Sequence, residues 1–526
     1  LVPADVDICV YGGNSTGVIA AVQAARMGKS VVLVSPTKHL GGLTSSGLGF
    51  TDMGDHRILG GLTRDYFHRV WRHYQRNEAW RWQSRAKFAN KGQHGAGLDD
   101  QLQIATVFEP HVAENIFNQL VAENQIPVIV SRLDRSAGVV KDGAVIKQIR
   151  TEDGVIVSAK IFIDATYEGD LMAAAGVGYT IGREANTQYG ETLNGIQAKQ
   201  STKNQLPGGI DPYRIKGRPD SGLLPGVNAD VGGADGSADR NIQAYCYRMC
   251  LTNHADNRIT ISKPAHYQES DYELLFRAIE AGQTNRFFKF SAVPNAKTDS
   301  NNDSGISTDY IGMNHAYPEA DYATREKIAG AHKNWQLGLL WTLQNNPRVP
   351  EKIRAAHRPW GLPGDEFTDS GHFPAELYIR EARRMIGDFI ISEPTLRQAV
   401  TPQPIAMGAY AMDSHHTQRY VGADGHVRNE GDVQKPLGKP YQIDYRSITP
   451  KAAECQNLLV PVCLSATHIA YGSIRMEPVF MTLGQSAATA AALSIDDTVS
   501  VRQLDYQKLK SRLEQDGQVL SLTSAK

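Results

Sequence analysis

The feature that most constrains this chain lies in its first residues. The apolar run 6–11 is followed by a short turn whose residues are Gly12, Gly13, Asn14, Ser15, Thr16 and Gly17, and an Ala-rich stretch follows at once. An apolar strand, a glycine-dense turn and a helix that opens on Ser and Thr predict a βαβ dinucleotide-binding unit. Glycines let the backbone approach a pyrophosphate, whose charge is stabilised by free N–H groups at the helix start.

Two positions depart from the usual fingerprint of such a unit. Asn14 stands at the middle glycine of G-x-G-x-x-G, and Ser35 ends the second predicted strand, where an Asp or Glu normally holds a ribose. Ser35 offers one hydrogen bond but no charge. The alternative interpretation is therefore a βα turn that binds no phosphate.

Later segments favour a flavin over a nicotinamide. Residues 128–130, a β-meander over 139–159 and the return strand 161–164 are expected to extend the sheet, with the return strand beside the first strand. Near the C-terminus, Glu477 and Pro478 open an Ala-rich helix that runs through residue 493. Proline is favoured at a first helical position, and the positive end of this helix is expected to face the flavin ring.

Composition limits the functional classes. The 526 residues carry a net charge of −1, which argues against binding of nucleic acid by bulk electrostatics. No apolar stretch is long enough to span a bilayer. The chain begins at Leu rather than Met, which indicates either a removed export signal, with a periplasmic or secreted location, or a cleaved tag.

The five cysteines suggest neither a disulfide framework nor a zinc site. They are odd in number and scattered, and Cys246 and Cys250 are expected to share a helix face. We interpret them as small buried hydrophobic residues.

The nucleotide-binding segments lie at both ends of the chain. We therefore predict an α/β protein with a discontinuous, two-dinucleotide-binding (Rossmann-like) FAD domain, residues 1–200 and 440–526, and an inserted α+β substrate domain, residues 201–439. The insert begins with a Pro/Gly/Asp-rich loop over 206–239 and contains helical patterns over 272–279 and 335–344.

Several long motifs resemble one known group. They comprise residues 10–13, 39–42, 164–171, 297–302, 380–385, 412–416 and 468–478. Together they resemble the bacterial FAD-dependent oxidoreductase family whose members are often labelled "xanthan lyase-like", and the similarity runs essentially from end to end. The resemblance implies a two-dinucleotide-binding fold, an inserted substrate domain and FAD as cofactor.

The residues expected to bind the cofactor come from the first glycine turn, from the end of the second predicted strand and from the later motifs. They are Gly12, Gly13, Asn14, Ser15, Thr16, Gly17, Ser35, Pro36, His39, Gly41, Gly42, Ala165, Thr166, Gly472, Glu477 and Pro478. His39 shortly precedes a glycine pair close to the expected flavin ring, and a histidine beside noncovalent FAD is preferred over a covalent attachment.

Four residues are candidates for catalysis: His468, Arg475, His415 and His416. His468 and Arg475 precede the helix that is expected to face the flavin. A histidine is suited to take an alcohol proton, and an arginine to hold a carboxylate or stabilise an alkoxide. The alternatives are that His468 caps a strand and that Arg475 pairs with Glu477. Since neighbours on an extended segment face opposite ways, at most one of His415 and His416 is expected to face a pocket.

Other polar residues are candidates for substrate binding. Arg380 and Arg384 are expected on one helix face with Arg383, either as a clamp for a sugar acid or phosphate or as a solvated face with ion pairs. Asn301 and Asn302 lie in a polar loop suited to sugar hydroxyls or to a turn. We predict no metal site.

These observations favour an FAD-dependent oxidoreductase that acts by hydride transfer to flavin N5 with a histidine base, and the resemblance implies a carbohydrate or related hydroxyl compound as the substrate that it oxidises. The substrate is then a small molecule or an oligosaccharide, and the electron acceptor is not specified. Three alternatives stay open: redox-neutral glycoside cleavage through a transient keto-sugar, a fumarate reductase-like reduction of a C–C bond, and a non-catalytic binding protein on a degenerate flavin fold.

Overall fold

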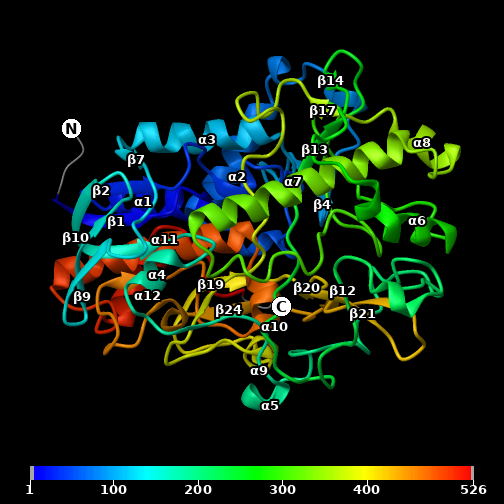
Figure 1. Ribbon diagram of the computed structural model, residues 1–526. Coiled ribbons are helices and arrows are strands. Elements are labelled where there is room, and N and C mark those ends of the chain that lie inside the picture. The colour runs from blue at the N-terminus through cyan, green and yellow to red at the C-terminus, as the bar shows by residue number, and fades with distance from the viewer. Residues whose placement is uncertain (1–4, 523–526) are drawn as a thin grey trace.

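The computed structural model describes residues 5–522. Its largest sheet has seven strands, is mainly parallel and lies at one side of the molecule (Figure 1). The strands of this sheet are β1 (Asp5–Tyr11), β2 (Val31–Ser35), β7 (Val128–Val130), β8 (Val139–Asp142), β9 (Val145–Arg150), β10 (Ile156–Asp164) and β25 (Leu458–Leu459). The order is β7-β2-β1-β10-β9-β8, and β25 pairs with the far end of β10. Strands β1, β2, β7, β10 and β25 run parallel, and β8–β9–β10 form an antiparallel meander.

The return strand lies beside the first strand, as predicted. Tyr11 of β1 is level with Val34 of β2 and with Asp164 of β10. The carboxyl ends of the three strands therefore meet at one edge of the sheet, where ligands bind in open α/β folds. One detail differs from the prediction, because residues 156–159 and 161–164 belong to the single strand β10 (Ile156–Asp164).

Successive side chains of β1 pack on opposite faces of the sheet. Ile8 and Val10 join the core under the helices, whereas Cys9 and Tyr11 join a second apolar cluster on the other face. This alternation is what a strand buried on both sides requires. The sheet is thus the middle layer of the cofactor-side core.

Helices cover the sheet and link both ends of the chain. They are α1 (Ser15–Arg26), α2 (Gly61–Tyr74), α3 (Pro110–Glu123), α4 (Asp170–Ala174), α10 (His468–Ile474), α11 (Glu477–Asp497) and α12 (Tyr506–Gln515). α1 and α11 contact each other closely. A Cβ on Gly484 would lie 2.4 Å from the carbonyl oxygen of Thr16, so the small residues of both helices permit this approach.

The middle of the chain forms smaller elements, most of which lie on the opposite side of the molecule (Figure 1). Its helices are α5 (Asn186–Tyr189), α6 (Glu273–Glu280), α7 (Tyr322–Asn345), α8 (Glu351–His357) and α9 (Glu393–Gln398). Its principal strands are β13 (Met249–Thr252), β15 (Ser291–Val293), β16 (Lys297–Ser300), β17 (Leu362–Pro363), β18 (Arg384–Met385), β19 (Pro404–Gly408), β20 (Met412–Ser414), β21 (Gln418–Val421), β22 (Val427–Glu430), β23 (Val433–Lys435) and β24 (Tyr441–Asp444).

Several local expectations for this region are confirmed. The helical patterns over 272–279 and 335–344 fall in α6 and α7, and residues 206–239 are mostly irregular. The domain boundaries stay a prediction, and β19 pairs with β24 across the expected boundary at residue 440.

Two helix predictions were wrong. Cys250 lies in β13, and Cys246 pairs with Tyr378 in an isolated antiparallel bridge. The segment 380–383 is not helical, and it leads directly into β18. All five cysteines are buried and free, in agreement with their interpretation as small hydrophobic residues. None of the helices in the described range 5–522 combines the length and apolar character needed to cross a membrane.

Candidate functional site

A cavity of about 380 Å³ opens at the carboxyl edge of the sheet, and we call it the sheet-edge cavity. Its lining includes Tyr11, Gly12, Gly13, Asn14, Ser35, Pro36, Thr37, Arg132, Thr166, Tyr167, Glu168, Asp170, Tyr247, Tyr317, Tyr322, Arg325, Glu326, Ala329, Ala375, Glu376, Leu377 and Ile379. The cavity thus joins the ends of β1, β2 and β10 to helix α7 and to the segment 375–379.

Glycines of the first turn let the backbone segments meet here. A Cβ on Gly13 would lie 2.1 Å from Ser35 Oγ, and one on Gly17 would lie 1.7 Å from the carbonyl oxygen of Gly12. Gly12 has φ +118°, a conformation that favours glycine. The first turn therefore forms a bare backbone cradle beneath the start of α1, and that arrangement fits a pyrophosphate.

Asn14 fixes this cradle although it stands at a glycine position of the fingerprint. It is the N-cap of α1, and its Oδ1 accepts a hydrogen bond from the Gly17 amide at 3.0 Å. Its amide group also donates to the carbonyl of Ala165, in the turn after β10. The substitution of Asn for Gly is thus accommodated by a capping role.

Glu477 connects several segments around the first turn by hydrogen bonds. Its carboxylate accepts hydrogen bonds from Ser15 Oγ at 2.6 Å, Thr44 Oγ1 at 2.8 Å and Tyr167 Oη at 2.8 Å. Burial raises the pKa of Glu477, and the three donors oppose that shift. Glu477, a predicted cofactor residue, therefore connects the start of α11 with the start of α1 and with the turn after β10.

Of the predicted cofactor residues, six line the sheet-edge cavity: Gly12, Gly13, Asn14, Ser35, Pro36 and Thr166. The others support it or lie outside its lining: Ser15, Thr16, Gly17, His39, Gly41, Gly42, Ala165, Gly472, Glu477 and Pro478.

Two of these residues outside the lining contact other parts of the protein. His39 Nδ1 lies 2.9 Å from Glu114, and hydrogen bonding to Glu114 raises the pKa of His39. A Cβ on Gly41 would lie 2.4 Å from the ring of Phe117. His39 and Gly41 therefore serve contacts within the protein.

A second cavity of about 230 Å³ is strongly polar, and we call it the polar cavity. It is lined by Phe50, Asp52, Gln93, Asn204, Arg248, Lys289, Ser291, Asn301, Asn302, Tyr378, Tyr410, Ala411, Asp413, His415, Gln434, Arg475 and Met476. Tyr378 faces this cavity, whereas its neighbours Leu377 and Ile379 line the sheet-edge cavity. One segment therefore forms a wall of both cavities.

His415 enters the polar cavity with a carboxylate behind it. Its Nδ1 lies 2.6 Å from Asp309 Oδ2, and Asp309 Oδ1 lies 2.9 Å from the guanidinium of Arg380. Burial and Arg380 lower the pKa of His415, although Asp309 opposes them. Burial alone would raise the pKa of Asp309, but Arg380 and His415 hold it well below its usual range. The imidazole is thus neutral at neutral pH and held by an ionised partner.

Arg475 supplies a cation to the same cavity. Its guanidinium donates to Tyr378 Oη at 3.0 Å and to the carbonyl of Asp413 at 3.0 Å, and the Asp413 carboxylate lies 3.7 Å away. Arg475 therefore does not form the ion pair with Glu477 that was the alternative to a functional role.

Asp52 brings a carboxyl group to the polar cavity. It accepts a hydrogen bond from Gln93 Nε2 at 2.7 Å, and burial raises the pKa of Asp52 to about 6. The cavity thus contains a neutral histidine, a cation and an acid whose proton is held more tightly than usual.

The remaining candidate histidines are placed differently. His468 begins α10 and lies outside the linings of both cavities, with Nδ1 2.9 Å from the carboxylate of Glu381. His416 is buried against the backbone carbonyls of Lys203 and Asn204. Of the neighbouring pair, His415 faces a cavity and His416 does not, as the alternation of an extended segment requires.

The arginines proposed as a clamp are buried partners of internal acids. Arg380 pairs with Asp309, and Arg384 Nη1 lies 2.8 Å from Glu184. Both side chains are fully buried, and neither lines the polar cavity. They therefore form neither a substrate clamp nor a solvated helix face, and Arg380 acts on the site through Asp309. Asn301 and Asn302, in contrast, line the polar cavity.

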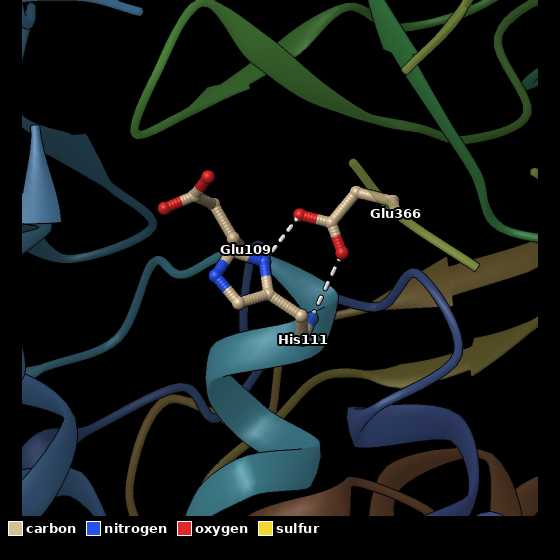
Figure 2. Close-up of side chains that lie close together, drawn as sticks. All are labelled: Glu109, His111 and Glu366. Atoms are coloured by element: carbon tan, nitrogen blue, oxygen red, sulfur yellow. Dashed lines mark hydrogen bonds and ion pairs between the residues drawn. The ribbon is translucent and has the colours of Figure 1, made fainter. Parts of the chain in front are cut away.

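Figure 2 shows a further cluster, formed by Glu109, His111 and Glu366. His111 Nδ1 lies 2.7 Å from Glu366, while Lys297 Nζ lies 2.8 Å from Glu109 and 2.6 Å from Glu366. Because the buried ammonium of Lys297 lies among these carboxylates, they are neutralised by the protein itself. We interpret the cluster as an ion-pair link between α3 and the inserted region.

Sequence reasoning missed most of the groups that α7 and the segment 375–379 bring to the sheet-edge cavity. Tyr322 and Arg325 lie on α7, and Glu376 lies in an irregular segment. It also missed Asp309, which has no motif of its own. A search for unpaired acids beside the candidate histidines would not have found it, because 106 residues separate Asp309 from His415.

This chain was compared with known protein families and with solved structures. The family model described as "FAD dependent oxidoreductase" matches residues 7–513. Solved structures with partial similarity include L-proline dehydrogenase from P. horikoshii (18% identity, 35% of this chain and 59% of that chain, TM-score 0.24) and L-amino acid deaminase from Proteus vulgaris (18%, 34% and 52%, TM-score 0.23). Thioredoxin reductase from T. acidophilum has 14% identity over 31% of this chain and 35% of that chain, with a TM-score of 0.18.

The chain spans between about a third and three fifths of the length of these structures. No curated protein matches the sequence. The family match, in contrast, covers nearly all of the chain and coincides with a Rossmann-type sheet whose edge carries a backbone cradle suited to a dinucleotide. The chain therefore belongs to the FAD dependent oxidoreductase family, with FAD as its cofactor.

Proposed function

We propose that this enzyme oxidises a hydroxyl group of a carbohydrate or a related polar compound, with His415 as the base. The observation that carries the proposal is the pair of His415 and Asp309 at the polar cavity, with Nδ1 and Oδ2 2.6 Å apart. When bound, FAD supplies a two-electron acceptor. The residues of the polar cavity then have to bind the substrate, orient it and remove its proton.

His415 is suited to the removal of a hydroxyl proton. Asp309 occupies Nδ1, so Nε2 is the nitrogen left to accept the proton. Asp309 also stabilises the imidazolium that forms when His415 accepts it, and Arg380 keeps Asp309 ionised. A histidine base that is oriented by a carboxylate is a common arrangement in acid–base catalysis.

The lining of the polar cavity supports a substrate rich in hydroxyl groups. Its side-chain amides come from Gln93, Asn204, Asn301, Asn302 and Gln434. Amide groups both donate and accept, as sugar hydroxyls require. The cationic groups of Lys289 and Arg475 at the same cavity also favour substrates that carry a carboxylate, such as uronic acids.

The size of the polar cavity favours a small substrate or one terminal unit of a larger one. Its volume of about 230 Å³ lies below the range of about 300–1,000 Å³ typical of sites for drug-sized ligands. An oligosaccharide would therefore present a single end unit to His415.

A second candidate function is redox-neutral cleavage of a glycoside, and Asp52 is the observation that favours it. Such a reaction needs an acid that protonates the leaving oxygen in addition to a base. Because burial raises its pKa to about 6, Asp52 keeps its proton under mildly acidic conditions and lines the same cavity as His415. The fumarate reductase-like alternative would instead require Arg475 as the proton donor.

The test is an anaerobic absorbance spectrum of the holoprotein before and after addition of single sugars, uronic acids and disaccharides. We expect the flavin absorbance to bleach with at least one free sugar or sugar acid. Cleavage of a disaccharide with no net bleaching and no added acceptor would favour the redox-neutral function. Oxidation of reduced holoprotein by an unsaturated acid, with no bleaching by any sugar, would contradict both and favour a reductase.

A further inference from the structure

We propose that Glu376, from the segment between β17 and β18, accepts the hydrogen bonds of the adenosine ribose of FAD. In dinucleotide-binding folds this acceptor is normally an acid at the end of the second strand, and here that position holds Ser35. The proposal concerns the cofactor site and does not depend on the substrate proposed above.

Glu376 lies where the missing acid is needed. It lines the sheet-edge cavity together with Ser35, Pro36 and Thr37, the residues at the end of β2. Thr37 Oγ1 donates to Glu376 Oε1 at 3.3 Å. Glu376 is 341 positions after Ser35 in the chain. Its carboxylate nevertheless contacts Thr37, which is only two residues after the position where the acid normally stands.

Ser35 itself is engaged elsewhere. Its Oγ donates a hydrogen bond to the carbonyl of Thr37, and it lies so close to the first turn that a Cβ on Gly13 would be 2.1 Å away. The Ser35 hydroxyl is therefore used to shape the turn after β2, and its single proton is already donated. A ribose needs an acceptor from another part of the chain.

Two of the other carboxylates of the sheet-edge cavity, Asp170 and Glu326, already have charged partners. Asp170 lies 2.6 Å from Arg325 and 2.8 Å from Arg383, and Glu326 lies 2.6 Å from Arg132. Glu168 accepts a hydrogen bond from Tyr317 Oη at 3.2 Å and follows β10 rather than β2. Charged partners therefore exclude Asp170 and Glu326, and its position beside the end of β2 distinguishes Glu376 from Glu168 as the acid that best fits the ribose.

Glu376 is half-buried at the cavity wall, and the protein supplies few donors to its carboxylate. Within residues 5–522 it forms no ion pair, and the weak contact with Thr37 is its one hydrogen bond. Burial, with a smaller contribution from Glu168, raises the pKa of Glu376 to about 7. Two vicinal ribose hydroxyls would supply the missing donors and favour the charged form.

The experiment measures release of FAD from the holoprotein. Wild type and the variant E376Q are diluted, and the rise of flavin fluorescence gives the dissociation rate. The same measurement is made after exchange of the bound cofactor for FAD analogues that lack the 2′- or the 3′-hydroxyl of the adenosine ribose. Because hydrogen bonds to a charged group are strong, we expect E376Q to release FAD about 10- to 100-fold faster than wild type.

The analogues provide a readout that a merely structural role would not change. We expect wild type to release at least one deoxy analogue about 10-fold faster than FAD. We expect E376Q to release that analogue and FAD at similar rates. The matched control is E114Q, which removes a carboxylate that binds His39 outside the cavity and should release FAD like wild type. A second variant, E168Q, removes the competing carboxylate.

Three results would overturn the proposal. The first is release of FAD from E376Q within about twofold of wild type, a smaller effect than a lost charged hydrogen bond produces. The second is faster release from E376Q with full discrimination against the deoxy analogues, which would place Glu376 away from the ribose. The third is loss of that discrimination in E168Q alone, which would assign the ribose to Glu168.

Discussion

The two cavities of this enzyme are built in opposite ways. The sheet-edge cavity includes the glycine backbone of the first turn, at the point where β1, β2 and β10 end level with one another. The polar cavity is formed by side chains from segments scattered between Phe50 and Met476. The first is shaped by glycines and a helix N-terminus, and the second by charged groups held at short distances.

This difference between the two cavities predicts which substitutions would disrupt cofactor binding and which would disrupt the chemistry. A backbone cradle fails when an added atom prevents two strands from meeting, and that failure affects folding and cofactor binding together. A network of charged side chains fails when a single partner is lost, because the other partner is left buried without its counter-charge, and that failure acts directly on the chemistry of the site. Variants that separate these outcomes test the comparison.

The largest effect is expected for H415N in the polar cavity. Removal of a general base typically lowers turnover about 10²- to 10⁴-fold, and Asn cannot accept the proton. Because His415 lies outside the sheet-edge cavity, the variant should retain FAD with an unchanged absorbance spectrum. Single-turnover flavin reduction measures the rate, and H426N, which changes a surface histidine, is the control. Full activity of H415N would remove His415 from the chemistry.

The next effect is expected for G17A in the cradle. A Cβ at this position would lie 1.7 Å from the carbonyl oxygen of Gly12, so the first turn has to open. We expect a loss of about 3 kcal/mol in stability and poor retention of FAD. Thermal unfolding and the flavin content of purified protein measure both. G330A, where an added Cβ meets nothing within 4 Å, is the matched control. Wild-type stability of G17A would contradict the close approach.

A smaller effect is expected for D309N, which leaves His415 in place but removes its partner. We expect turnover to fall about 10- to 100-fold, since a charged hydrogen bond that orients the base is lost. Asp309 raises the pKa of His415 against burial and Arg380, so its removal should lower that pKa further. Because neutral His415 is the active form, the acid limb of kcat/KM lies below the usual histidine value near 6.5 in wild type and should move to still lower pH in D309N. An acid limb that moves upward would contradict this assignment.

The smallest effect is expected for N301A. Asn301 lines the polar cavity and is suited to a neutral hydrogen bond with a substrate hydroxyl. Loss of one such bond should raise KM about 3- to 10-fold and leave kcat nearly unchanged. Steady-state kinetics with the substrate identified by flavin bleaching measure both constants. An equal fall in kcat and kcat/KM would mean that Asn301 acts in the transition state instead.

Much of the cofactor side could be predicted from the sequence. The strand 6–11, the glycines after it and the start of a helix at Ser15 form one continuous segment, and local sequence decides such a unit. Pro478 likewise marks the first turn of α11, which extends to Asp497 rather than ending at residue 493. The prediction was less successful for the cavity lining, since His39 and Gly41 serve contacts within the protein.

The substrate side could be predicted only in part. His415, Arg475, Asn301 and Asn302 were identified from their motifs, and the structure brings all four to the polar cavity. The arginines from 380 onward were placed on a helix because their spacing allows one. Tertiary structure instead buries this segment, where Asp309 and Glu184 neutralise Arg380 and Arg384.

The sequence by itself determined the α/β cofactor fold and the family, because glycine turns, apolar strands and small-residue helices express short-range rules of backbone geometry. Only the tertiary structure decided which histidine meets Asp309 and which acid reaches the end of β2. Those pairings join residues more than a hundred positions apart. These contacts depend on buried surroundings and on short distances between polar groups, and the chain has neither until it folds.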